Sequence, residues 1–148
     1  MILTHPSYGN VETACLHFMN EMDMKGIRPT KIVALSRGGL ILGVILSHNL
    51  HVPMIPVQYS SKIGKGDDRN HVNELPNLIG QVVLVVDDIA DSGHTLDEVV
   101  KHFSDTGSNV FSAAMYWKEG SVITPTMHWH ELPTDAPFIH FPWEKNLR

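Results

Sequence analysis

Apolar positions follow two different spacings along this chain. Between residues 10 and 25 they recur at the three- and four-residue spacing of a helix that buries one face. Residues 82–86 instead form an unbroken, largely β-branched run, which is typical of a strand covered on both faces of a parallel sheet. Such segments alternate, which predicts an α/β fold with a doubly wound parallel sheet flanked by helices. The predicted helices are 10–25, 40–50 and 95–106, and the predicted strands are 31–35, 53–58, 82–86 and 109–117, with a further strand at 127–131.

Two acids follow the most apolar of these strands. Asp87 and Asp88 come directly after Val86, and ligands of open α/β sheets bind outside the carboxyl ends of the strands. Carboxylates accept hydrogen bonds from a sugar diol and are preferred ligands of Mg²⁺. Magnesium usually keeps substrate oxygens as well, so two acids alone do not form a high-affinity cage.

The next residues predict an anion site. Loop 91–95 carries hydroxyls and a glycine and leads into the helix predicted at 95–106. A helix start presents free N–H groups to an anion, and glycine allows the backbone to approach it closely. We expect Thr95 to cap this helix, with Glu98 three residues later completing a capping box. Together with the acids, the loop has the anatomy of a phosphate- and metal-binding strand end.

A second strand end has a related form. Strand 31–35 is followed by a glycine pair and then by an apolar helix. Strand–Gly–Gly–helix junctions are common, so this segment alone is weak support for an anion site, and Arg37 could equally be solvent exposed. We expect the peptide between Arg37 and Gly38 to be strained.

Residues 60–78 form a long polar stretch that contains glycine. Loops longer than about 12 to 15 residues in compact domains are usually lids, binding loops or disordered connections. We expect a lid loop at about 60–78, and a solvated insertion is the alternative.

Composition narrows the functional classes. With 148 residues the chain is too short for two ordinary domains, so we expect a single domain spanning residues 1–148. A net charge of −5 argues against a broad surface for nucleic acid or anionic membranes. No apolar stretch approaches the ~20 residues of a membrane span, and the N-terminus lacks signal-peptide features, so a cytoplasmic protein is expected.

Cysteine and histidine add no chemistry of their own. Cys15 is the only cysteine, and its place on the apolar stripe of helix 10–25 predicts a buried, inert thiol. Among ten histidines, His128 and His130 would share one face of a strand, but no third ligand stands at a zinc spacing.

Residues 82–95 resemble the signature of the type I phosphoribosyltransferases: an apolar strand, paired acids, two variable residues and then Asp-Ser-Gly-x-Thr. The resemblance implies that phosphoribosyl pyrophosphate binds here, with Asp87 and Asp88 near the ribose hydroxyls and the accompanying Mg²⁺. It also implies that Asp91 is the general base, because the family aspartate at this position lies near the purine N7. The loop that would hold the 5′-phosphate comprises Asp91, Ser92, Gly93, His94 and Thr95.

Further segments resemble the bacterial xanthine-guanine branch of that family. Lys118 matches a lysine that donates to the 6-oxygen of the purine. In a C-terminal hood segment at about 120–148, Phe138 matches the residue that stacks on the base, with Ile139 beside it. The residues similar to the pyrophosphate loop are Ser36, Arg37, Gly38 and Gly39.

Two positions depart from these relatives. They usually carry Ser-Tyr in the lid where this chain has Ser61 and Lys62, although Lys62, Lys65 and Arg69 could bring positive charge to pyrophosphate. They also tend to have an acid where this chain has His140, which leaves the base preference open.

The resemblance implies a purine-salvage enzyme that moves the 5-phosphoribosyl group to guanine, xanthine or hypoxanthine with Mg²⁺ as cofactor and releases pyrophosphate. Two alternatives stay open: an RNA-binding regulator with the same fold, which the acidic charge disfavours, and a transferase that acts on uracil, orotate or adenine. A nucleotide triphosphatase is disfavoured because no Walker A segment occurs. By analogy with relatives we expect a homodimer or homotetramer.

Overall fold

Residues 1–61 and 74–148 are described by the computed structural model, and within them five parallel strands form one sheet in the order β2-β1-β3-β4-β5. This arrangement confirms the expected parallel α/β sheet, including the strand expected at 127–131. The strands are β1 (Lys31–Leu35), β2 (Met54–Val57), β3 (Val82–Ala90), β4 (Asn109–Lys118) and β5 (Met127–Leu132). The helices are α1 (Tyr8–Lys25), α2 (Gly39–Leu50) and α3 (His94–Asp105), and a 3₁₀ turn, η1, spans Pro142–Glu144.

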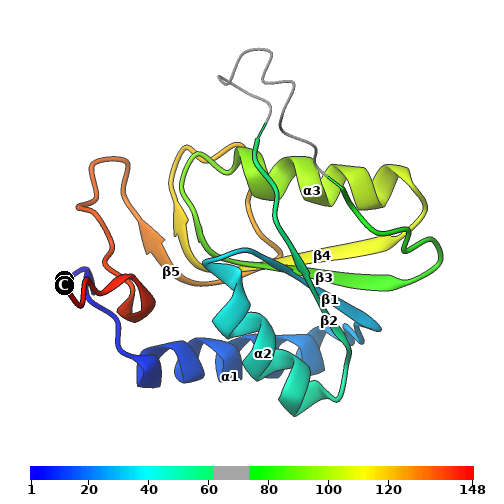
Figure 1. Ribbon diagram of the computed structural model, residues 1–148, viewed down its shortest axis with the longest axis horizontal. Helices are drawn as coiled ribbons and strands as arrows, with labels where there is room; N and C mark the ends of the chain where they lie inside the picture. The colour runs from blue at the N-terminus through cyan, green and yellow to red at the C-terminus, as the bar shows by residue number, and fades with distance from the viewer. Residues whose placement is uncertain (62–73) are drawn as a thin grey trace.

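Helices cover both faces of the sheet, with α1 and α2 on one side and α3 on the other (Figure 1). Phe18 of α1 packs in the same core cluster as Leu84, whereas Phe103 of α3 packs with Val85. Neighbouring residues of a strand point to opposite faces, so β3 is buried on both sides, as its unbroken apolar run predicts. None of the helices in the described part of the chain is both long and apolar enough to cross a membrane.

β3 is longer than its apolar run. It continues to Ala90, so Asp87 and Asp88 lie within the strand, and the expectation that they follow it is wrong. The reason is the neighbouring strand: β4 pairs with β3 as far as Ala90, whereas pairing with β1 stops at Val86. Beyond Val86 the two acids therefore lie on a strand with one paired edge and one open edge.

Only the two ends of the predicted lid lie within the described residues. Leu78 is buried, Leu75 packs against the α3 side of the sheet, and the Ser108 hydroxyl donates to the Leu78 carbonyl over 2.7 Å. Leu75 and Leu78 thus anchor this end of the segment to the core, and the lid itself stays a prediction. The lid residues outside the described part of the chain are Lys62, Lys65 and Arg69.

The segment predicted as a C-terminal hood, about 120–148, includes β5, which belongs to the sheet; we use the term hood below for residues 133–148, which follow β5. The first residues of the chain run alongside it (Figure 1). The backbone N–H of His140 donates to the Thr4 carbonyl over 2.8 Å, and the Tyr116 hydroxyl donates to the Leu3 carbonyl over 2.7 Å. The segment before α1 is therefore tied to both the sheet and the hood.

The thiol of Cys15 is free and buried in the core, as predicted. Burial, with the nearby charge of Glu12 as a second cause, raises the pKa of the Cys15 thiol to about 12. At neutral pH it is therefore a thiol and not a reactive thiolate.

Candidate active site

The loop after β1 lies directly against the acids of β3. A Cβ atom on Gly38 would overlap the Asp88 carboxylate, and a Cβ atom on Gly39 would overlap the carbonyl oxygen of Val86. Both positions require glycine for this close approach. The peptide bond between Ser36 and Arg37 is cis, and the strain expected of the next peptide, Arg37–Gly38, stays a prediction.

Asp87 and Asp88 form an electrostatically unfavourable pair. The N–H of Asp88 donates to Asp87 Oδ1 over 2.9 Å, and the N–H of Ile89 donates to Asp88 Oδ1 over 2.8 Å. The pKa of Asp88 is raised to about 6, chiefly by burial and to a smaller extent by the charge of Glu144, while hydrogen bonds to its carboxylate oppose the rise. Burial also raises the pKa of Asp87, and the Asp88 charge is its second cause. Such a pair favours a bound cation, which would offset the cost of two ionised carboxylates.

The loop between β3 and α3 also requires a glycine. Gly93 is the N-cap of α3 in the left-handed region, with φ of 81°, and no side chain caps this helix. The capping box expected of Thr95 and Glu98 is therefore wrong, because α3 begins at His94. A Cβ atom on Gly93 would overlap the Ser121 hydroxyl, so glycine is needed here for two reasons.

The loop is held from the β4–β5 connection. The backbone N–H of Val122 donates to the Ser92 carbonyl over 2.9 Å. His94 and Thr95 occupy the first turn of α3, where backbone N–H groups favour an anion. The predicted phosphate loop thus begins after the acid pair and two intervening residues, where β3 ends, and leads into a helix, although the capping of that helix differs.

A pocket of about 210 Å³ joins Asp91 to the hood. Lys118, the last residue of β4, lines this pocket and places its Nζ 3.2 Å from Asp91 Oδ1, so the two side chains form an ion pair at the pocket wall. Phe138 lines the pocket and is 71% exposed, whereas Ile139 beside it is buried at 4% exposure. This one pocket thus brings together the four residues to which the sequence resemblance assigns base binding and proton exchange: Asp91, Lys118, Phe138 and Ile139.

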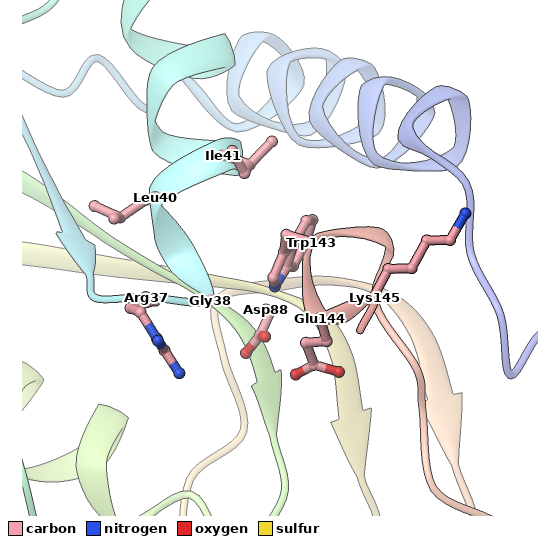
Figure 2. Close-up of a pocket in the computed structure, with 8 residues that line it drawn as sticks. All are labelled: Arg37, Gly38, Leu40, Ile41, Asp88, Trp143, Glu144 and Lys145. Carbon is pink, nitrogen blue, oxygen red and sulfur yellow. The ribbon is translucent and has the colours of Figure 1, made fainter. Parts of the chain in front are cut away.

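A larger cleft of about 660 Å³ lies on the other side of Asp88 (Figure 2). Arg37 and Gly38 of the β1 loop form one part of its wall, and Trp143 and Glu144 of η1 form another. Figure 2 shows the carboxylates of Asp88 and Glu144 next to each other. Since both acids also line the smaller pocket, the two cavities meet at this pair.

Sequence analysis missed Glu144, Trp143 and Lys145 as site residues. The only local signal was an acid after an aromatic residue in the tail, which does not show that η1 folds back against β3. Of the two residues predicted as lid contacts, Ser61 is the last described residue before the gap, and Lys62 lies outside the described residues, as do Lys65 and Arg69.

The donor set of this site fits Mg²⁺, because Asp87, Asp88 and Glu144 offer only carboxylate oxygens. Within residues 1–61 and 74–148, no group of three histidine, cysteine or acidic side chains converges closely enough to hold a metal ion. Magnesium at this site would therefore need oxygens from a bound substrate, in keeping with its preference for one or two carboxylates.

Comparisons with known proteins agree with this geometry. A family model described as the phosphoribosyl transferase domain matches residues 7–147. A xanthine-guanine phosphoribosyltransferase of Idiomarina loihiensis is 27% identical over 120 residues, which are 78% of this chain and 71% of the relative. An adenine phosphoribosyltransferase of Bordetella pertussis is 32% identical over 89 residues, which are 51% of this chain and 48% of the relative.

Structural comparison leads to the same family. The crystal structure of a purine phosphoribosyltransferase from Pyrococcus horikoshii Ot3 matches with a TM-score of 0.79 at 25% identity, over 97% of this chain and 94% of that chain. This chain belongs to the type I phosphoribosyltransferase family, as residues 82–95 predict. Because relatives named for xanthine-guanine and for adenine both match, the comparisons identify the family and not the base.

Proposed function

We propose that this protein transfers the 5-phosphoribosyl group from phosphoribosyl pyrophosphate to a ring nitrogen of a 6-oxopurine. The observation that supports this base class is the ion pair of Lys118 and Asp91, which are 3.2 Å apart and both line the small pocket. Lysine is a hydrogen-bond donor with no acceptor, so Lys118 complements a 6-oxygen better than the 6-amino group of adenine. Asp91 is an acceptor for an N–H of the same ring.

Each of the two cavities would bind a different part of the substrates. The small pocket would hold the base against Phe138, and the larger cleft would hold pyrophosphate between the Arg37 loop and the acids. Asp87 and Asp88 would bind the ribose hydroxyls. Magnesium, where bound with the substrate, supplies positive charge that stabilises the leaving pyrophosphate.

The chemistry is one exchange of bonds at the anomeric carbon of ribose. The bond from that carbon to pyrophosphate breaks, and its electron pair leaves with pyrophosphate. A lone pair of the purine nitrogen forms the new bond, and Asp91 accepts the proton that the ring releases. Donors from the loop after β1 stabilise the negative charge of the leaving group, with Arg37 as its cationic side chain.

A base screen tests this proposal. Guanine, xanthine, hypoxanthine, adenine, uracil and orotate would each be supplied with phosphoribosyl pyrophosphate, with Mg²⁺ or with excess EDTA. We expect nucleoside monophosphate and pyrophosphate from at least one 6-oxopurine, faster than from adenine, and no turnover with EDTA. Faster turnover of adenine would refute the base assignment, and no turnover of any base would refute the enzyme and direct attention to an RNA shift assay.

Replacing Lys118 with alanine tests the base contact. A hydrogen bond to a charged group contributes about 1.5–3 kcal/mol, so we expect the purine KM to rise about 10- to 100-fold. The KM for phosphoribosyl pyrophosphate should change far less, because Lys118 lines the pocket on the hood side. Lys101→Ala is the matched control, since Lys101 lies on α3 and pairs with Asp97 at the surface. An unchanged purine KM in Lys118→Ala would show that this lysine only stabilises the strand end.

A further inference from the structure

A row of three aromatic rings connects the base pocket to the start of the chain. The rings of Phe138 and His140 lie 4.9 Å apart between centroids, with planes inclined at 64°. The ring of His140 stacks on that of His5, at a centroid distance of 4.7 Å and an angle of 14°. We name Phe138, His140 and His5 the aromatic row. Because Phe138 lines the pocket, the row reaches from the proposed base site to the segment before α1.

The two histidines of this row are held in place by hydrogen bonds of residues 3–5. The His140 N–H donates to the Thr4 carbonyl over 2.8 Å, so the two histidines are joined by backbone as well as by stacking. The Thr4 hydroxyl lies 3.0 Å from His5 Nδ1, and the Leu3 carbonyl accepts a 2.7 Å hydrogen bond from Tyr116. Residues 3–5 are therefore docked on β4 and on the hood, and they give His140 a fixed surface to pack on.

Phe138 needs such support. Its ring is 71% exposed, whereas Ile139 and Phe141 on either side of His140 are each 4% exposed and anchor the backbone. Burial alternates from Phe138 to Phe141, so Phe138 and His140 lie on the opposite side from the buried pair. Packing against His140 restricts the rotamers of Phe138 before any base arrives.

From these contacts we infer that His5 and His140 are positioning residues for purine binding, which act by holding the Phe138 ring in its stacking orientation. The inference rests on the proposed function. Neither histidine is among the residues that line the pocket, so the effect passes through Phe138. A ring that is already ordered loses less conformational freedom when the base binds, and such preorganisation strengthens binding. His140, at a position where relatives tend to have an acid, thus packs on His5.

The test uses single and paired substitutions in the full chain. An aromatic pair contributes enough to change affinity about two- to tenfold, so we expect His140→Ala and His5→Ala each to raise the purine KM about three- to tenfold. The values of kcat and of the KM for phosphoribosyl pyrophosphate should stay within about twofold. His140→Phe and His5→Phe keep a stacked ring and should restore the purine KM. The double alanine variant should be no worse than the poorer single variant, because both break one row.

His48→Ala serves as the control, since His48 is an exposed histidine on α2, away from the hood. An unchanged purine KM in both single alanine variants would overturn the inference. An equal rise in the KM values for the purine and for phosphoribosyl pyrophosphate, which His140→Phe and His5→Phe do not restore, would also overturn it. That result would indicate a misfolded hood. If the wild-type protein turns over no purine, the proposed function fails, and equilibrium binding of the purine alone to the same variants then decides the inference. Absence of any purine binding would overturn both.

Discussion

Asp91→Asn is expected to lower kcat for purine transfer by about 10²- to 10⁴-fold, the usual contribution of a positioned general base. Asparagine keeps the size of the side chain and can still accept a hydrogen bond, but it cannot take up a proton at neutral pH. Asp91 is 66% exposed and pairs with Lys118 at 3.2 Å, so its replacement leaves the core unchanged. We therefore expect the KM for phosphoribosyl pyrophosphate to stay close to that of the wild type.

Steady-state kinetics with both substrates varied measure this effect, and product formation in a single turnover separates the chemical step from product release. Asp105→Asn, an exposed acid at the end of α3, is the matched control. A variant that retains wild-type kcat would remove Asp91 from its catalytic role. A rise in purine KM with unchanged kcat would instead assign Asp91 to binding alone.

The second large effect concerns Asp88, for which we expect opposite changes in stability and activity. Its pKa is raised from 3.8 to about 6, chiefly by burial, so the ionised form costs folding free energy. A raised pKa in the folded state means that stability is greatest below the unfolded value and is lost as pH rises through about 6. The ligand-free protein should therefore become more stable when pH falls from 8 to 5, since Asp87 is shifted in the same direction.

Asp88→Asn removes this penalty. The shift corresponds to on the order of 3 kcal/mol at pH 8, and for a chain of this size about 1 kcal/mol moves Tm by roughly 2–4 °C. We expect the Tm of ligand-free Asp88→Asn to exceed that of the wild type by several degrees at pH 8, with the difference shrinking toward pH 5. Asparagine can still accept the hydrogen bond that the Ile89 N–H donates to Asp88 Oδ1 over 2.8 Å.

We expect the activity of Asp88→Asn to fall, although its stability rises. Without its charge the side chain binds magnesium and the ribose hydroxyls poorly, so we expect turnover to fall by at least about 10²-fold, as for the loss of other charge-stabilising groups. Phosphoribosyl pyrophosphate with Mg²⁺ should raise the Tm of the wild type but not that of the variant. Thermal unfolding from pH 5 to 8 and an activity assay measure both effects, with Asp23→Asn, a surface acid paired with Arg28, as control. A variant less stable than the wild type at pH 8, or one that remains fully active, would contradict the assignment.

The sequence predicts the acids and the phosphate loop of the site better than it predicts the position of the hood. The acids and the phosphate loop occupy one continuous segment, so the sequence alone could place them together and indicate the family. Residues of the hood lie far along the chain, and their relation to the acids depends on how η1 packs. Glu144 illustrates this limit, because its effect on the Asp88 pKa comes from proximity in the fold.

The sequence by itself determined the parallel sheet and its central strand, and it indicated the segments of paired acids and glycines as candidate ligand sites, because these patterns act over a few neighbouring residues. Only the tertiary structure decided that β3 extends through its acids, since that depends on pairing with β4. It also decided that Gly93 opens α3, that Lys118 meets Asp91 and that His5 stacks on His140. These features rest on contacts between segments distant in the chain, and local sequence patterns carry no information about such contacts.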